Sequence, residues 1–161
     1  MFRKGDRVVY PHHGAATVQD IQHRELLGER KKYLVLRLAY SDLTLSVPVD
    51  NTAEVGLREV VPKREVKKVL DVLRQSESRM PTNWSRRFKT NVEKLRSGDI
   101  FQVAEVVRNL SIRDKSKGLS AGEKRMLAKA RQILVSELTF AVEATEEKAE
   151  AMIDKVLAES H

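Results

Sequence analysis

The spacing of apolar residues changes once along this chain, and the change constrains its fold more than any other feature. In roughly the first 50 residues, apolar and polar side chains alternate in short β-branched runs, as in strands with one buried face. These runs lie at 7–10, 16–21, 33–38 and 43–48, and turn residues at 11–14, 28–29 and 41–42 separate them. Four or five such strands predict a small, strongly bent antiparallel sheet or barrel of the Tudor or SH3-like kind.

The remainder of the chain has the period of α-helices. Its apolar stripes are Val66/Val69/Leu70/Leu73, Ile100/Val103/Ala104/Val107/Leu110, Met126/Leu127/Ala130/Ile133/Leu134/Leu138 and a weaker Ala149/Met152/Ile153/Val156. Helix starts are signalled by Asp99, by Thr145, by the pair Ser120 and Glu123 (a capping box), and by Pro81 followed by Thr82 or Asn83. We therefore expect about five helices between residues 63 and 159.

Together the two patterns predict a two-domain α+β protein. We expect a Tudor-like β domain over residues 1–55, a linker over 56–62 and a compact all-α domain over 63–161. A chain of 161 residues is long enough for two small domains, each with a modest core.

The charge of the chain is concentrated in its middle. The formal net charge is +7, but residues 62–131 hold nineteen Lys/Arg and eight Asp/Glu, whereas residues 132–161 hold two and seven. A basic segment between a near-neutral head and an acidic tail is typical of a protein that contacts a polyanion, and nucleic acid is the first candidate. An ordinary solvated lysine-rich surface is the alternative.

Several classes of protein do not fit the sequence. It has no cysteine, no apolar run long enough for a membrane span and no apolar signal segment, so we expect a cytoplasmic protein without membrane contact. Phosphate-binding glycine loops are absent, and the adjacent His12 and His13 would point apart, which makes a shared metal ion improbable. No nucleophile, base and orienting group can be argued from spacing. We therefore expect no enzyme, no metal and no cofactor.

The one tryptophan of the chain, Trp84, is followed within five residues by the three cations Arg86, Arg87 and Lys89. This combination suits a protein that binds phosphates while an aromatic wedge presses against DNA bases. The spacing of Trp84 and Phe88 also fits two core residues on one helix face, with the cations on the solvated side. Both interpretations remain open from these residues alone.

Three separated segments carry a resemblance to a known family. They are GDRVVYPHHG at 5–14, PTNWSRR at 81–87 and GLSAGEKRMLAKAR at 118–131. In this order they resemble the CarD/CdnL family of bacterial RNA polymerase-binding transcription regulators, and the likeness covers essentially the whole chain. The first segment is also similar to a module of the transcription-repair coupling factor, whose helicase motifs are missing here.

The resemblance implies a partner and a mechanism. In CarD-like proteins a Tudor-like domain docks on the β1 lobe of the RNA polymerase β subunit, in holoenzyme with the principal sigma factor. The helical domain then reaches promoter DNA at the upstream edge of the transcription bubble, often at ribosomal RNA promoters. There a tryptophan enters the minor groove and stabilises the open complex. The resemblance thus implies a cytoplasmic transcription factor, associated with the nucleoid through polymerase and expected to act as a monomer.

Carried over by motif, the resemblance also implies roles for particular residues. Trp84 matches the wedge, and the implied phosphate contacts are Arg86, Arg87, Lys89 and Lys124, with Arg125 and Lys129 as further candidates. Arg24 matches a basic residue that contacts polymerase. This chain has Ser46 where some relatives place a polymerase-contacting arginine, so docking is expected to be weaker unless Arg37 or the basic run at 30–32 compensates.

Two other functions fit the same residues. One is an SH3-like nucleic-acid-binding protein that acts on DNA or RNA without polymerase. The other is a scaffolding adaptor whose basic helices bind an acidic protein. Tight DNA binding that polymerase does not change would favour the first, and insensitivity to loss of Trp84 or to competitor DNA would favour the second.

Overall fold

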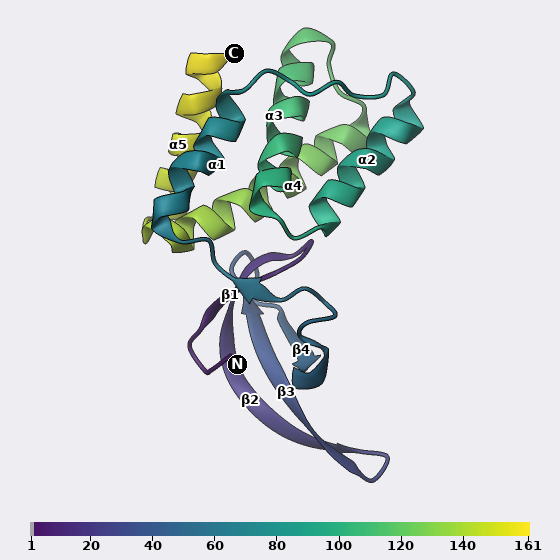
Figure 1. Cartoon of the computed structure of the whole chain (residues 1–161), viewed down its shortest axis with the longest axis vertical. Coiled ribbons are helices and arrows are strands. Elements are labelled where there is room, and N and C mark those ends of the chain that lie inside the picture. The colour runs from purple at the N-terminus through teal and green to yellow at the C-terminus, as the bar shows by residue number, and fades with distance from the viewer. Residues whose placement is uncertain (1) are drawn as a thin grey trace.

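A computed structural model describes residues 2–161 and places a β-sheet against a group of helices (Figure 1). The strands are β1 (Arg7–Tyr10), β2 (Gly14–Leu26), β3 (Glu29–Leu38), β4 (Thr44–Pro48) and β5 (Arg58–Glu59). The helices are α1 (Val66–Arg74), α2 (Trp84–Arg96), α3 (Ile100–Ser116), α4 (Ala121–Val142) and α5 (Glu146–Ser160), and the short 3₁₀ turns are η1 (Val49–Asn51) and η2 (Lys63–Glu65). The predicted α+β architecture, strands first and then five helices, is confirmed.

The sheet is antiparallel, with strand order β4-β3-β2-β1-β5. Its core consists of Val8, Ala16, Val18, Leu34, Leu36, Val47 and Leu57. Strands β2 and β3 are longer than predicted and form a hairpin whose tip points away from the helices (Figure 1). The outer half of this hairpin is rich in charged residues and lacks the alternation that marks a strand with one buried face. Its turn residues Leu27 and Gly28 have φ angles of 53° and 79°, which is the geometry of a tight type I′ hairpin.

The segment predicted as a linker, residues 56–62, contains a short edge strand of the sheet. It contains β5, in which Arg58 and Glu59 pair with Val9 and Val8 of β1. Leu57, just before this strand, belongs to the buried core of the sheet. The chain therefore enters the helical part from an edge strand, and the first regular helix begins at Val66.

The helices begin where side chains can cap them. Asn83, Asp99, Ser120 and Thr145 each accept a hydrogen bond from a backbone N–H in the first turn of α2, α3, α4 and α5. The predicted capping box of Ser120 and Glu123 is confirmed. The predicted apolar stripes supply the helical core, in which α3 and α4 pack against each other. No helix within residues 2–161 combines the length and apolar character that crossing a membrane requires.

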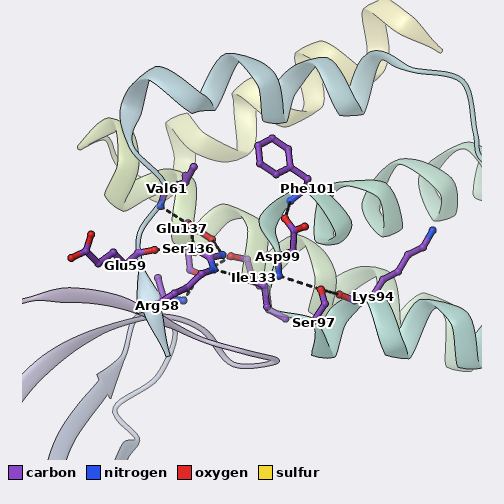
Figure 2. Close-up of polar contacts among 12 residues, drawn as sticks. Arg58, Glu59, Val61, Lys94, Ser97, Asp99, Phe101, Ile133, Ser136 and Glu137 are labelled. Atoms are coloured by element: carbon purple, nitrogen blue, oxygen red, sulfur yellow. Dashed lines mark hydrogen bonds and ion pairs between the residues drawn. The ribbon is translucent and has the colours of Figure 1, made fainter. Parts of the chain in front are cut away.

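A compact set of contacts joins the sheet to α4. Arg58 reaches from β5 to Glu137, which is 1% exposed, with both Nη–Oε distances at 2.7 Å (Figure 2). Glu137 also accepts the Val61 N–H at 2.8 Å, and Ser136 accepts the Ala15 N–H at 3.0 Å. At Gly14, a Cβ atom would come within 2.8 Å of Ser136 Oγ, so this turn needs glycine both for its φ of +87° and for its closeness to α4. These contacts fix the orientation of the sheet relative to the helices.

Candidate functional site

Trp84 lies at the first position of α2 and is 44% exposed. One face of its indole stacks on Phe88, with ring centroids 4.9 Å apart and planes 18° from parallel. The ring Nε1–H donates to Ser120 Oγ at 3.0 Å. The side chain is therefore anchored on one side, as the core interpretation predicted, and still presents indole surface to solvent, as a wedge requires.

Two helix N-termini meet at this tryptophan. Helix α2 starts at Trp84 itself, and Ser120, which accepts the indole hydrogen bond, is the N-cap of α4. Gly122 in the first turn of α4 lies against the rings, since a Cβ there would be 3.6 Å from the Trp84 ring and 3.5 Å from that of Phe88. The positive ends of two helix dipoles add to the surrounding cations, and this combination favours a bound anion such as a phosphate.

Arg87 differs from its prediction as a phosphate contact. It is 4% exposed, and its Nε donates to Glu123 Oε2 at 3.0 Å while its Nη1 donates to the Thr82 carbonyl at 3.2 Å. A guanidinium held in this way faces the protein interior, so the Arg87 side chain is not free to contact a DNA phosphate as predicted. It ties the start of α2 to the start of α4 and thereby positions Trp84.

Glu123 completes this support. Its carboxylate accepts from Arg87 and from the Ser120 hydroxyl, and the same hydroxyl accepts from Trp84. Burial opposes ionisation of Glu123, but hydrogen bonds from Arg87 and Ser120 outweigh it and lower the pKa of this carboxyl. A continuous chain of polar contacts thus runs from a buried ion pair to the exposed indole.

This lowered pKa predicts a loss of stability in acid. A group whose pKa is depressed in the folded state contributes fully above its unfolded value, here 4.5, and the contribution is lost as the pH falls through the folded value. We expect the thermal midpoint to fall more steeply between pH 6 and pH 3 for the wild type than for Glu123→Gln, which cannot ionise. The exposed Glu93→Gln serves as the control, and identical profiles for Glu123→Gln and the wild type would contradict the assignment.

The other predicted DNA contacts lie on the two helices that meet at Trp84. Arg86 and Lys89 are exposed on α2, Lys124 and Arg125 are exposed on α4, and Lys129 is half-buried. Arg125 and Lys129 line a groove on α4 together with Arg131 and Gln132. Lys129 also lies close to the β1–β2 turn, where burial and then its charge lower the pKa of His12 and of His13. Apart from the buried Arg87, the predicted cations thus lie on two helices whose N-termini meet at Trp84.

The three predicted polymerase contacts share one face of the sheet. Arg24 Nη2 donates to Ser46 Oγ at 3.1 Å and to Gln22 Oε1 at 2.9 Å, and its guanidinium lies over the Tyr33 ring at 5.2 Å. Ser46 pairs across the strands with Val35, and Arg37, two residues further along β3, points to the same side. Arg37 also forms an ion pair with Asp42 at 3.2 Å. Ser46 therefore supplies no charge where some relatives have an arginine. Its hydroxyl instead accepts from Arg24 and orients that guanidinium.

Comparison with known proteins assigns both halves of the chain. Residues 2–61 match the CarD-like/TRCF RID domain, and residues 68–154 match the CarD C-terminal domain. The chain is 36% identical over 148 residues to the "Putative transcription factor YdeB" of Bacillus subtilis (strain 168), covering 92% of this chain and 97% of that protein. Two solved structures from Myxococcus xanthus also match. One is CdnLNt (36% identity, 38% of this chain, 86% of that chain, TM-score 0.34), and the other is the N-terminal domain of CarD (29%, 37%, 79%, 0.32).

The two family matches and the Bacillus subtilis relative define the chain as a transcription regulator whose N-terminal module is of the kind that interacts with RNA polymerase. It belongs to the CarD/CdnL family, whose members are generally not enzymes. The resemblance drawn from the three sequence motifs is confirmed.

Proposed function

We propose that this protein is tethered to RNA polymerase and stabilises the promoter open complex. In this proposal the sheet docks on the β1 lobe of the polymerase β subunit, and Trp84 enters the minor groove at the upstream edge of the bubble. The observation that carries the proposal is the setting of Trp84: its side chain is half-exposed, stacks on Phe88 and lies where the N-termini of α2 and α4 meet.

The cations and the tryptophan would have separate tasks. Lysine and arginine on phosphates supply affinity that does not depend on sequence and that favours closed and open promoters alike. A ligand shifts an equilibrium only through its different affinity for the two states. The exposed face of Trp84 supplies this difference if it stacks on an unstacked base step at the bubble edge, which intact duplex does not offer.

Tethering makes weak DNA binding sufficient. A regulator held on polymerase presents its DNA-binding surface at a high effective concentration, provided that the connection allows both contacts at once. Here the connection is the contact between the sheet and α4, built on Arg58, Glu137, Ser136 and Gly14. The position at which the sheet docks on polymerase therefore determines where Trp84 meets the DNA.

The docking surface in this proposal is the face that carries Arg24 and Ser46. Strand β4 lies at the edge of the sheet, and the hydrogen bond from Arg24 to Ser46 places a cation beside that edge. An edge strand has backbone groups free to pair with another chain. A partner that pairs with the edge and offers a carboxylate to Arg24 would use both features.

Reversing the charge of Arg24 tests the docking step. We expect Arg24→Glu to fold normally but to lose co-purification with polymerase and, with it, the extension of open-complex lifetime on a ribosomal-type promoter. Lys148→Glu, an exposed change of equal charge on α5, is the matched control. If Arg24→Glu co-purified with polymerase as well as the wild type does, the assignment of this docking face would be wrong. Tight DNA binding by the wild-type protein that polymerase does not change would favour a regulator that acts without polymerase.

A further inference from the structure

A second cationic site lies beside Trp84 and is used by none of the functions above. The loop between α1 and α2 and the C-terminal end of α3 border an open pocket of about 440 Å³. Its lining includes Glu77, Arg79, Thr82, Arg87, Arg113 and Lys117. We refer to it as the loop pocket.

The wall of the loop pocket is fixed by buried polar groups. Arg108, 2% exposed, donates to the Val72 carbonyl at 3.1 Å and also to the hydroxyl of Ser78. Asn109 accepts the Ser78 N–H at 3.0 Å, and Arg87 holds the Thr82 carbonyl at the other end of the loop. The loop is thus tied to α3 and α2, and the pocket is preorganised.

The charges in the loop pocket favour an anion. Arg79, Arg113 and Lys117 line it, whereas Glu77 is the one carboxylate among its lining residues. Within residues 2–161, the buried Nε of Arg113 has no hydrogen-bond partner, and the nearest carboxylate oxygen, on Glu123, is 4.0 Å away. A buried donor without an acceptor is costly, so an anion that accepts from Arg113 would be bound favourably.

Helix geometry separates this pocket from Lys89 and Arg125, two of the predicted DNA cations. Successive residues of an α-helix are rotated by about 100°. On α2, Arg87, which lines the pocket, lies about 60° to one side of Trp84, and Lys89 about 140° to the other side. On α4, Glu123 and Arg125 likewise fall on opposite sides of Gly122, the residue in contact with the indole. Lys89 and Arg125 therefore lie on the other side of the contact between Trp84 and Gly122 from the loop pocket.

We propose that the loop pocket binds a backbone phosphate of the DNA strand opposite the one contacted by Lys89 and Arg125. This inference rests on the proposed function, because it takes Trp84 to enter a minor groove. Such a groove is bordered by the phosphates of both strands, so a wedge placed between them is held best by cations on both sides. Arg79 and Lys117 are the exposed contacts, and Arg113 donates from the floor of the pocket.

The test uses the full chain and a forked DNA duplex that mimics the upstream bubble edge. Binding is measured at several salt concentrations for the wild type, Arg79→Gln/Lys117→Gln and the control Lys115→Gln/Lys148→Gln, which removes equal charge outside the pocket. We expect the pocket variant alone to flatten the slope of log K against log salt by about 1.8, at about 0.9 per lost contact. A slope equal to that of the control would overturn the proposal.

Neutral methylphosphonate linkages, placed on one strand at a time, then identify the strand. For the wild type, a neutral linkage on either strand should weaken binding. Arg79→Gln/Lys117→Gln should become insensitive to substitution of one strand, and Lys89→Gln/Arg125→Gln to substitution of the other. Continued sensitivity of the pocket variant to both strands would overturn the proposal, as would the absence of fork binding by the wild type.

Two further measurements distinguish DNA binding at the loop pocket from binding of a free phosphate and from the action of Trp84. If inorganic phosphate binds the wild type at the pocket while the pocket variant binds DNA like its control, the site serves a free phosphate ligand and the DNA assignment fails.

The contribution of Trp84 is tested by measuring Trp84→Ala in the same fork-binding assay. If it binds the fork like the wild type while the pocket variant shows the expected losses, the wedge of the proposed function is wrong, but the pocket still binds a backbone phosphate of DNA. This assay contains no polymerase, so a failure of polymerase docking leaves its result unaffected.

Discussion

Replacing Trp84 with alanine is expected to shorten the lifetime of open promoter complexes by about 5- to 150-fold, because stacking of an aromatic side chain on a base is worth about 1–3 kcal/mol. The indole is half-exposed and leaves Phe88 in place when it is removed, so the fold should persist. The lifetime is measured with matched polymerase on a ribosomal-type promoter, after a competitor has blocked rebinding.

Two comparisons make this result specific. Binding of Trp84→Ala to polymerase should equal that of the wild type, because Trp84 lies on α2 and the docking face lies on the sheet. Trp84→Phe keeps an aromatic face but loses the hydrogen bond to Ser120. Open complexes with this variant should therefore have a lifetime between those with Trp84→Ala and those with the wild type. Equal lifetimes for Trp84→Ala and the wild type would remove the wedge from the mechanism and leave only the family relationship.

The elements that sequence predicts well are those whose signals are local. The cap at Ser120, the start of α2 at Trp84 and the apolar stripe of α4 all depend on residues within a few turns of one another. The same locality explains two failures. The two-residue strand β5 has no period to detect, and the outer half of the β2–β3 hairpin lacks the alternation that marks a strand with one buried face.

The site was predicted only in part, because some of its contacts join residues far apart in the sequence. Motif resemblance selected Trp84 and its neighbouring cations, but it could not show that Arg87 is buried, because its partner Glu123 lies 36 residues further along the chain. Both residues belong to recognised segments, and their opposite charges are visible in the sequence. Nothing in the sequence pairs them, so the assignment of Arg87 to phosphate needed the fold to correct it. The loop pocket was missed because Arg79, Arg113 and Lys117 come from two separate segments.

Replacing Arg58 with alanine is expected to lower the free energy of unfolding by about 3–5 kcal/mol, the range found when one partner of a buried ion pair is removed. The remaining Glu137 carboxylate is 1% exposed and would lose both of its contacts from Arg58, keeping the Val61 N–H. Glu137→Ala should cost less, because the side chain of Arg58 is 31% exposed and water can solvate part of it. Denaturant unfolding measures both variants, and the exposed Glu93→Ala, expected within about 0.5 kcal/mol of the wild type, is the control.

The same substitution tests whether the joint between sheet and helices matters for function. Arg58 joins β5 to α4, so its loss should loosen the sheet from the helices and split a single calorimetric transition into two. Arg24 and Trp84 are untouched in Arg58→Ala, and polymerase binding should persist at temperatures below the first transition. Open-complex lifetime should nevertheless fall, because a loose connection spreads the tryptophan over more positions and lowers its effective concentration at the bubble edge. A wild-type lifetime in a variant with two transitions would mean that docking alone, without a fixed orientation, is sufficient.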